Sequence, residues 1–174
     1  ELAYFIVEHP KTARQFLKQI SSKHALQTLN MQILDEHTPS DDLVTLLDPL
    51  LAGHDVGLLS EACCPAVADP GAELVRLAHK NNIRIIPLVG PSSILLALMA
   101  SGLNGQQFAF NGYLPIESNA RISKIIELEK LSISRNQTQI FIEAPYRNQK
   151  LLEQLVKTCS DSTNLCIASH LTFS

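Results

Sequence analysis

Short apolar runs alternate with helix-forming segments along nearly the whole chain, and this alternation constrains the fold more than any other feature of the sequence. The runs typical of buried strands lie at residues 2–8, 31–34, 55–60, 83–88, 108–111, 138–143 and 164–169. Segments typical of helices separate them, at residues 10–20, 40–53, 70–79, 93–101, 118–131 and 148–159. Strands that alternate with helices usually join into a parallel sheet with helices packed on it. The sequence therefore predicts an α/β fold with a mainly parallel sheet.

The helix predicted at residues 40–53 carries its own start and stop signals. Ser40 is expected to cap its N-terminus, and Gly53 is expected to end it. Pro49 lies inside this segment and is expected to kink the helix or to end it early, because proline has no backbone N–H.

The chain divides into two stretches. Residues 1–112 are predicted to form an N-terminal α/β domain, residues 113–117 a linker, and residues 118–174 the front part of a second α/β domain. The second stretch is short for a domain with its own core. Because the chain opens on an interior-type strand and not on methionine, we expect a fragment of a longer protein.

Composition excludes several classes of protein. The 174 residues are 45% hydrophobic and 18% charged, which is unlike disordered or low-complexity chains. No apolar run approaches the roughly 18 residues of a membrane span, so we expect no membrane contact. The net charge of −3 gives no overall attraction to nucleic acid. The cysteines lack C-x-x-C spacing and are expected to be thiols of a reducing compartment, the cytoplasm (Cys63, Cys64, Cys159 and Cys166).

Small-residue loops are predicted at the carboxyl ends of the strands, where open parallel sheets bind ligands. They lie at residues 60–69, 89–93 and 143–147. The first lets backbone approach a ligand closely, and the second offers free N–H groups and hydroxyls at a helix start. The alternative, that these loops are ordinary strand-to-helix turns, stays open at this point.

Some titratable side chains are placed for chemistry. Glu8, Glu61 and Glu143 each follow an apolar strand, and His37 is the histidine expected to face a cleft. The histidines show no paired metal-ligand spacing, so no metal is expected. Phosphate-loop, dinucleotide and hydrolase motifs are absent from the sequence.

A set of motifs occurs in a specific order. It consists of residues 60–71 (SEACCPAVADPG), 87–93 (PLVGPSS), 100–102 (ASG) and 110–115 (FNGYLP), with 36–37 (EH) before and 142–147 (IEAPYR) after. In these motifs the chain resembles the tetrapyrrole methylase superfamily, the class III S-adenosylmethionine-dependent methyltransferases. Within it, the chain is most similar to the ribosomal RNA small-subunit methyltransferase I branch.

The resemblance implies a two-domain fold with the methyl donor, S-adenosylmethionine, in the cleft between the domains, in a homodimer. It assigns donor and product (S-adenosylhomocysteine) contacts to the residues Ala62, Cys63, Cys64, Val67, Ser92, Ser93, Ile94, Ile142 and Ala144. Glu143, Tyr146 and Arg147 would face the methyl acceptor. The sequence departs from the family pattern at Cys63, where the family has glycine, and at His9–Pro10, where it has Asp-Thr. It also lacks the family's opening strand and closing strands, so the first strand of the N-terminal domain is expected to be missing.

The resemblance thus implies an S-adenosylmethionine-dependent methyltransferase, with a ribose 2′-hydroxyl of ribosomal RNA as its expected acceptor. Glu61, Glu143 and His37 are the candidates for a general base. From residue 117 onward, seven Lys and Arg face six Asp and Glu, with no aromatic platform predicted beside them, which argues against RNA. A small-molecule methylase of the tetrapyrrole type and a non-catalytic donor-binding relative are therefore kept as alternatives.

Overall fold

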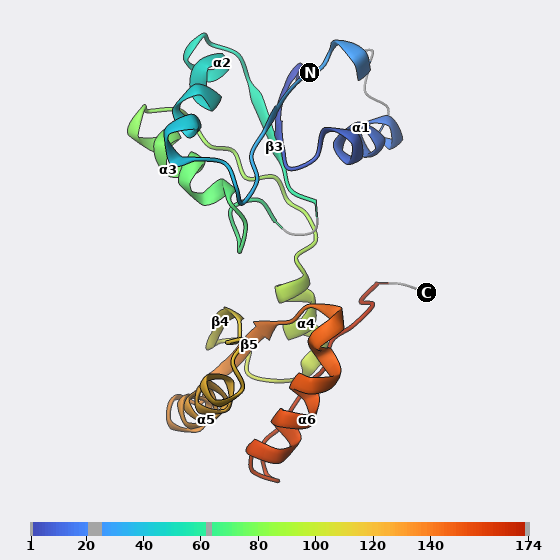
Figure 1. Ribbon diagram of the computed structural model, residues 1–174, viewed down its shortest axis with the longest axis vertical. Coiled ribbons are helices and arrows are strands. Elements are labelled where there is room, and N and C mark those ends of the chain that lie inside the picture. Colours follow the sequence, from blue (N-terminus) through green and yellow to red (C-terminus); the bar gives the residue numbers. More distant parts are fainter. Residues whose placement is uncertain (1, 21–25, 62–63, 173–174) are drawn as a thin grey trace. The chain divides into compact units, whose positions relative to one another are not determined.

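A computed structural model describes residues 2–20, 26–61 and 64–172 of the chain. It divides the chain into two compact units, Glu1–Gly90 and Pro91–Ser174. Helices and parallel strands alternate in both units, which confirms the predicted α/β class (Figure 1).

The sheet of the first unit is formed by the parallel strands β1 (Tyr4–Val7), β2 (Asn30–Ile33) and β3 (Val56–Leu59). β1 lies in the middle, in the order β2-β1-β3. Since all strands run the same way, the residues that follow β1 and β3 lie at the same edge of the sheet.

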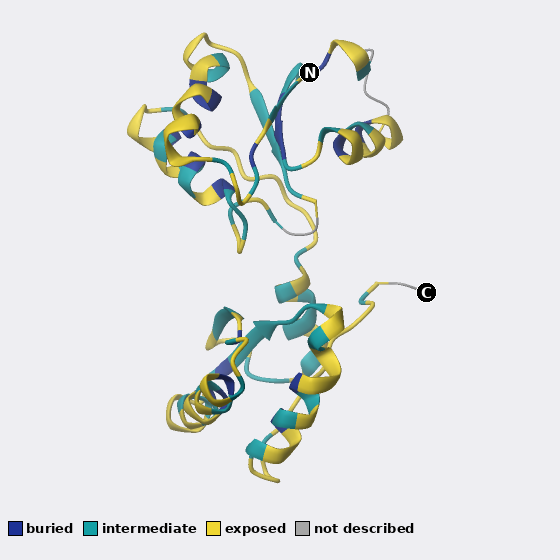
Figure 2. Cartoon of the chain, in the orientation of Figure 1, coloured by how far each residue is buried: buried dark blue, intermediate teal, exposed yellow. Residues whose placement is uncertain are grey.

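Helices cover both faces of this sheet: α1 (Pro10–Gln19), η1 (Leu26–Thr28), η2 (Ser40–Leu47), α2 (Asp48–Leu51) and α3 (Gly71–Lys80). Neighbouring residues of a strand point to opposite faces. Accordingly, Ile6 packs with η2 and α3, whereas Phe5 and Val7 pack with α1. Figure 2 shows the buried positions along β1 and on the helix faces turned toward it.

The helix predicted at residues 40–53 is divided in the structure. The 3-10 helix η2 ends at Leu47, and α2 begins at Asp48 with Pro49 in its first turn. A proline ring clashes with the carbonyl four residues before it but fits a first turn, which confirms that Pro49 ends the earlier helix. Gly53, at φ +86°, follows α2 as predicted. The prediction of a Ser40 cap is wrong, because Pro39 holds the cap position and no side chain caps the helix.

The strands predicted at residues 83–88 and 164–169 are wrong, since neither segment belongs to a sheet among the described residues. Ile86, Leu88 and Ile167 are more than 60% exposed. An apolar run becomes a strand only where a neighbouring strand pairs with its backbone, and no described strand does so here.

The second unit holds α4 (Ser93–Ser101), β4 (Phe108–Tyr113), α5 (Ser118–Arg135), β5 (Thr138–Ile142), η3 (Pro145–Arg147) and α6 (Asn148–Thr158). β4 and β5 are parallel neighbours. Leu114 packs with Ile125 and Leu128 of α5 and with Leu151 and Leu155 of α6. Together they form the core of this unit.

The two units divide between Gly90 and Pro91, earlier than the linker predicted at residues 113–117, because β4 pairs with β5. The domain boundaries drawn from the sequence stay a prediction. Among the described helices, none has the length and apolar character needed to span a membrane.

Candidate functional site

The carboxyl ends of β4 and β5 meet at one edge of the second unit. Tyr113, the last residue of β4, pairs with Ile142, the last residue of β5. Phe110 pairs with Ile140, so two residues of β4 face one residue of β5 between these two pairs. The extra residue makes a bulge at Asn111 and Gly112. Gly112 adopts φ +63°, a conformation that glycine takes without strain. The bulge sets the direction in which Tyr113 leaves the strand.

An ion pair follows β5 directly. Glu143 and Arg147 are four residues apart across the single turn η3, and a guanidinium N–H of Arg147 donates to Glu143 Oε1. Ala144 is extended, as residues before proline prefer, and its N–H donates to the same oxygen at 2.8 Å. The Glu143 side chain is 5% exposed and that of Arg147 16% exposed. The pair is therefore largely shielded from water.

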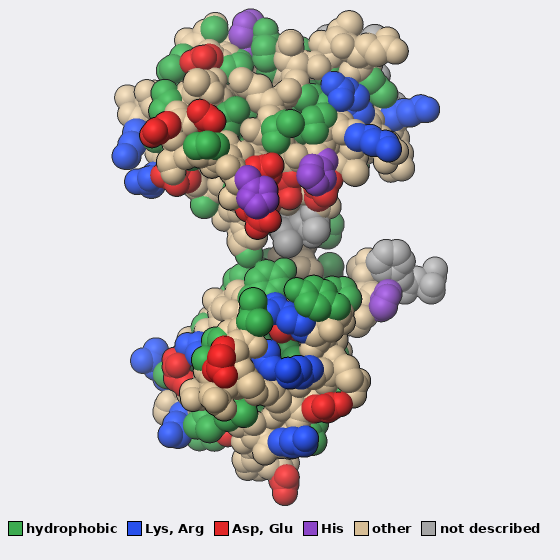
Figure 3. Space-filling view, viewed as in Figure 1, with side chains coloured by type: hydrophobic (Ala, Val, Ile, Leu, Met, Phe, Trp, Pro, Cys, Tyr) green, Lys and Arg blue, Asp and Glu red, His purple; other side chains and the backbone are tan. Residues whose placement is uncertain are grey.

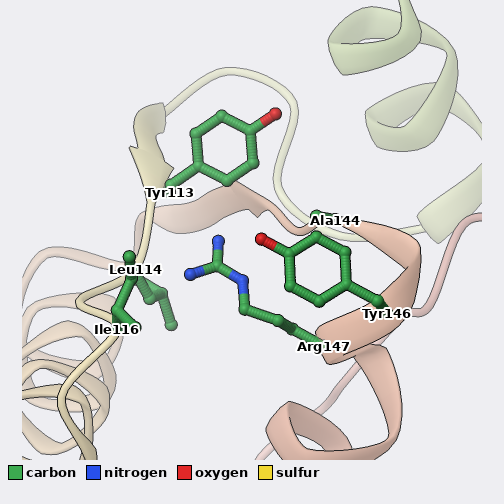
Figure 4. Close-up of a pocket in the computed structure, with 6 residues that line it drawn as sticks. All are labelled: Tyr113, Leu114, Ile116, Ala144, Tyr146 and Arg147. Carbon is green, nitrogen blue, oxygen red and sulfur yellow. The ribbon is translucent and has the colours of Figure 1, made fainter.

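The guanidinium of Arg147 lies beside two tyrosine rings. Its central carbon is 5.9 Å from the ring centre of Tyr113 and 5.8 Å from that of Tyr146, within the range of cation–π attraction. These three residues line a pocket of about 370 Å³ together with Leu114, Ile116 and Ala144. Figure 4 shows the guanidinium pointing into the space that the tyrosines and Leu114 surround. We call this space the tyrosine pocket.

Part of the ion pair has no hydrogen-bond partner. Nε and Nη1 of Arg147 and Oε2 of Glu143 are buried and unpartnered among the described residues. Buried polar atoms are normally satisfied, so unpartnered donors and an acceptor beside a pocket indicate a place where a polar ligand or water completes the bonding.

One wall of the tyrosine pocket is fixed from behind by a buried arginine. Arg121 of α5 is 2% exposed and donates from Nη1 to the carbonyls of Pro115 and Ile116, at 3.3 and 3.2 Å. Its Nε donates to Gln154 of α6, which in turn donates to Ser118 at 2.8 Å. The segment that follows Tyr113 is thereby attached to both helices.

A second cluster lies at the carboxyl ends of β1 and β3 in the first unit. The N–H of Glu61 donates to Glu8 Oε1 at 3.0 Å, and the hydroxyl of Thr12 donates to the Glu61 carboxylate. His9 Nε2 is 4.0 Å from Glu61 Oε2. Figure 3 shows acidic and histidine side chains gathered at one edge of this unit. Glu61 is about one-third exposed, so its carboxylate is accessible to a substrate proton.

His37 is not part of this cluster. It is 83% exposed and lies 3.6 Å from Glu36. Its backbone N–H donates to Asp35 Oδ1 at 2.9 Å, and this bond, with the Thr38 hydroxyl, holds the pKa of Asp35 below its usual value. The structure thus uses the backbone of His37 to close a turn and leaves its imidazole in solvent.

The loop predicted to contact the methyl donor is strained where the structure describes it. Ala66 and Ala68 adopt φ +67° and +55°, on either side of the exposed Val67. Asp69 Oδ1 accepts from the N–H groups of Ala66 and Gly71, at 3.4 and 3.1 Å. Non-glycine residues in this conformation cost about 1 kcal/mol or more and are concentrated at functional sites. Two further predicted donor contacts, Ala62 and Cys63, lie outside the described residues.

The other residues predicted to contact the donor differ in burial and in their position in the fold. Cys64 is half-buried, and its carbonyl accepts from Val67 N–H at 3.1 Å. Ser92, Ser93 and Ile94 form the start of α4, with Ser93 exposed. Ile142 and Ala144 lie beside Glu143. The donor contacts fall on both units, and their joint arrangement stays a prediction.

The structure also identifies residues that the sequence did not single out for these sites. Tyr113 supplies the aromatic surface beside Arg147, although no such platform was predicted. His9 and Thr12 contact Glu61. The available signal was their position, since Tyr113 and His9 lie at or just after the carboxyl end of a strand and Thr12 lies in the first turn of the helix that follows β1. Within the described residues, no group of His, Cys, Asp and Glu has the arrangement to hold a metal ion.

The fold resembles that of a solved methyltransferase. The crystal structure of the methyltransferase CobJ matches 91% of this chain and 77% of its own chain with a TM-score of 0.52, at 15% sequence identity. No family model matches the sequence. This likeness shows that the chain shares the α/β fold of that protein.

The sequence relatives are more specific. The chain is 34% identical over 139 residues to ribosomal RNA small subunit methyltransferase I of Vibrio cholerae, covering 80% of this chain and 47% of the relative. The protein of the same name from Xylella fastidiosa is 32% identical over 165 residues, covering 95% of this chain and 57% of that protein. The one from Pseudomonas aeruginosa is 37% identical over 120 residues, covering 69% of this chain and 40% of that protein. The chain spans about half the length of the curated relatives that it matches. It is a homologue of ribosomal RNA small subunit methyltransferase I, which confirms the resemblance seen in the motifs.

Proposed function

We propose that the chain is an S-adenosylmethionine-dependent methyltransferase that methylates a ribose 2′-hydroxyl of small-subunit ribosomal RNA. The observation that carries this proposal is the sequence similarity to ribosomal RNA small subunit methyltransferase I along four-fifths of the chain. The proposal includes a homodimer, which sedimentation of the purified chain tests.

The methyl donor arrives already activated, so the reaction needs no metal, and the protein has to bind, align and exclude water. We assign donor binding to the loop with Cys64 and Val67, to the start of α4 and to the end of β5. The loop fits this role because its small residues and its strained backbone allow close approach. Ser93 adds an exposed hydroxyl at the start of α4.

The acceptor hydroxyl has to lose its proton when the carbon–oxygen bond forms. Of the three carboxylate and imidazole candidates, Glu61 is the best placed general base, because it is accessible and is oriented by Thr12 and His9. Glu143 is engaged by Arg147 and acts as a positioning residue. His37 ranks below Glu61, because its imidazole and the carboxylate of the neighbouring Glu36 are both more than 80% exposed.

A tetrapyrrole-type small molecule is the second candidate acceptor, and the net charge of −3 favours it. The tyrosine pocket supports RNA instead, since aromatic rings beside an arginine are the surface on which unpaired bases stack. Acceptor binding that weakens steeply with salt supports RNA, whereas binding that is insensitive to salt supports the small molecule.

Two measurements test the proposal. Calorimetric titration of the 174-residue chain with S-adenosylhomocysteine should give saturable binding, and labelled methyl groups should pass from S-adenosylmethionine to protein-free small-subunit RNA. Glu61→Gln should lower the transfer rate by about 100-fold, the lower end for loss of a general base, with S-adenosylhomocysteine affinity unchanged. Glu73→Gln, an exposed glutamate of α3 paired with Arg76, is the matched control.

The outcomes separate the candidates. If the folded chain does not bind S-adenosylhomocysteine, the proposal that it is an S-adenosylmethionine-dependent enzyme is wrong. Binding of the product without transfer to RNA or to a tetrapyrrole would support the non-catalytic relative. Equal transfer by wild type and Glu61→Gln would show that another group accepts the proton.

A further inference from the structure

The tyrosine pocket exposes aromatic surface to solvent. Tyr146 is 85% exposed and Tyr113 is 58% exposed, although both rings flank the guanidinium of Arg147. The cation–π contacts hold the rings near the pocket and leave other ring surface free. Such an arrangement offers a flat ligand a platform for stacking.

The charge of the pocket favours a neutral group as its ligand. Arg147 is the one charged residue among the six that line the pocket, and it is already paired with Glu143. A phosphate bound here would have to compete with a buried carboxylate for the same guanidinium. A neutral flat ring makes the stacking contacts without that competition.

The unpartnered atoms of the ion pair define a hydrogen-bonding pattern. Nε and Nη1 of Arg147, which lines the pocket, are donors without a partner among the described residues, whereas Glu143, whose Oε2 is also unpartnered, is not one of the lining residues. The edges of nucleobases present carbonyl or ring-nitrogen acceptors next to N–H donors. The acceptors of a base edge are therefore complementary to the two donors of Arg147, whereas an apolar ring would leave these donors unsatisfied.

The size of the pocket is sufficient for one small ring system. Its volume of about 370 Å³ is near the lower end of the range of small-ligand sites, roughly 300–1,000 Å³. Leu114 and Ile116 close one side with apolar surface, and Arg121 fixes this wall through the carbonyl of Ile116. The wall is thus held in place before any ligand arrives.

We infer that the tyrosine pocket holds a single unpaired nucleobase of the RNA acceptor, stacked on Tyr146 with its edge toward Arg147. The inference rests on the proposed function for the identity of the polymer as RNA. It adds that the chain recognises RNA through an unstacked base, with stacking in place of a strongly basic surface. This reconciles RNA as acceptor with a net charge of −3.

The test is an anisotropy titration of the chain with a labelled single-stranded RNA of ten nucleotides. An abasic oligomer of the same length and charge and a fully paired duplex are the comparison ligands. The single strand should bind at least about fivefold more tightly than the abasic oligomer. Tyr146→Ala should weaken single-strand binding by about tenfold, because stacking on one aromatic ring is lost. Tyr146→Phe keeps the ring and should stay within about twofold.

Salt dependence distinguishes a base contact from a phosphate contact. The slope of log affinity against log salt should be equal for wild type and Tyr146→Ala, since stacking releases no counterions. Ile133→Ala, which removes another exposed apolar side chain of this unit, is the matched control and should bind like wild type. Tyr146 is largely exposed, so its variants should keep the fold, which circular dichroism verifies.

The inference is overturned by equal binding of the single strand and the abasic oligomer, by no binding of either, or by unchanged affinity in Tyr146→Ala. Tyr146-dependent displacement of the RNA by a carboxylated porphyrin would assign the pocket to a small molecule and would also overturn it. The proposed function fails separately, if labelled methyl groups do not reach RNA while Tyr146-dependent binding persists. Methyl transfer to RNA that is unaffected by Tyr146→Ala would support the proposed function and would contradict a role of the tyrosine pocket in binding the acceptor.

Discussion

At the scale of single residues, the tyrosine pocket depends on a glycine that makes no contact with it through a side chain. Gly112 at φ +63° is one of the two bulge residues, and a methyl group added at its Cα would meet nothing within 4 Å. Its requirement is therefore conformational and not steric. Because the bulge precedes Tyr113 directly, a change of backbone at Gly112 moves the tyrosine ring relative to Arg147.

Gly112→Ala should lower the free energy of unfolding by about 1–2 kcal/mol, the cost of a left-handed conformation for a residue with a Cβ atom. Gly105→Ala is the control, since Gly105 also has open space around its Cα but no positive φ, and it should change stability by less than about 0.5 kcal/mol. Urea unfolding measures both. Equal stabilities of the two variants would mean that Gly112 relaxes to an ordinary backbone conformation at no cost.

Single residues also show what the sequence could and could not predict. Glu61, Glu143 and Arg147 were predicted at carboxyl ends of strands, and the structure gives each an interacting partner. Tyr113 was placed in a linker, because the run at residues 108–111 was expected to end before it. The bulge extends β4 by two residues, and bulges leave little trace in the pattern of apolar residues. His9 was noted only as a departure from the family pattern, since its distance to Glu61 depends on the register of β1 with β3.

At the scale of elements, helices were predicted more reliably than strands. A helix closes its hydrogen bonds within one segment, so local signals such as Pro10 and Gly53 are sufficient to locate its ends. A strand needs a partner from elsewhere in the chain. The runs at residues 83–88 and 164–169 have the composition of buried strands, yet remain unpaired in the described part of the chain. Their sequence alone does not say whether a neighbour is present.

The pairing of α5 and α6 shows how elements stabilise the pocket. Arg121→Ala should lower the free energy of unfolding by about 2–4 kcal/mol, because two carbonyls and Gln154 lose a charged donor inside the second unit. Lys124→Ala, on the same helix, breaks only a surface pair with Glu127 and should cost about 0.5 kcal/mol or less. Denaturant unfolding compares the variants, and equal costs would show that the buried network contributes no more than a surface pair.

At the scale of the whole molecule, the predicted donor contacts fall on two compact units. Cys64 and Val67 belong to Glu1–Gly90, whereas Ser92 and Ser93 belong to Pro91–Ser174. The proposed base, Glu61, is in the first unit, and the tyrosine pocket is in the second. If the proposal holds, neither unit contains the complete machinery for methyl transfer, so a substitution in either one should be sufficient to prevent donor binding.

Ser93→Arg and Val67→Arg test this division of the donor contacts. Each introduces a long charged side chain at an exposed position of one unit, and each should weaken S-adenosylhomocysteine binding by at least tenfold in a calorimetric titration. Ser134→Arg, at an exposed serine near the end of α5, is the control and should bind like wild type. Arginine in the first turn of α4 also opposes the helix dipole, at a cost of about 0.3–1 kcal/mol, so circular dichroism has to confirm that Ser93→Arg is folded. If only Val67→Arg loses binding, the donor contacts belong to the first unit, and if only Ser93→Arg loses binding, they belong to the second. If both variants keep wild-type affinity, the donor binds elsewhere and the proposed division of its contacts is wrong.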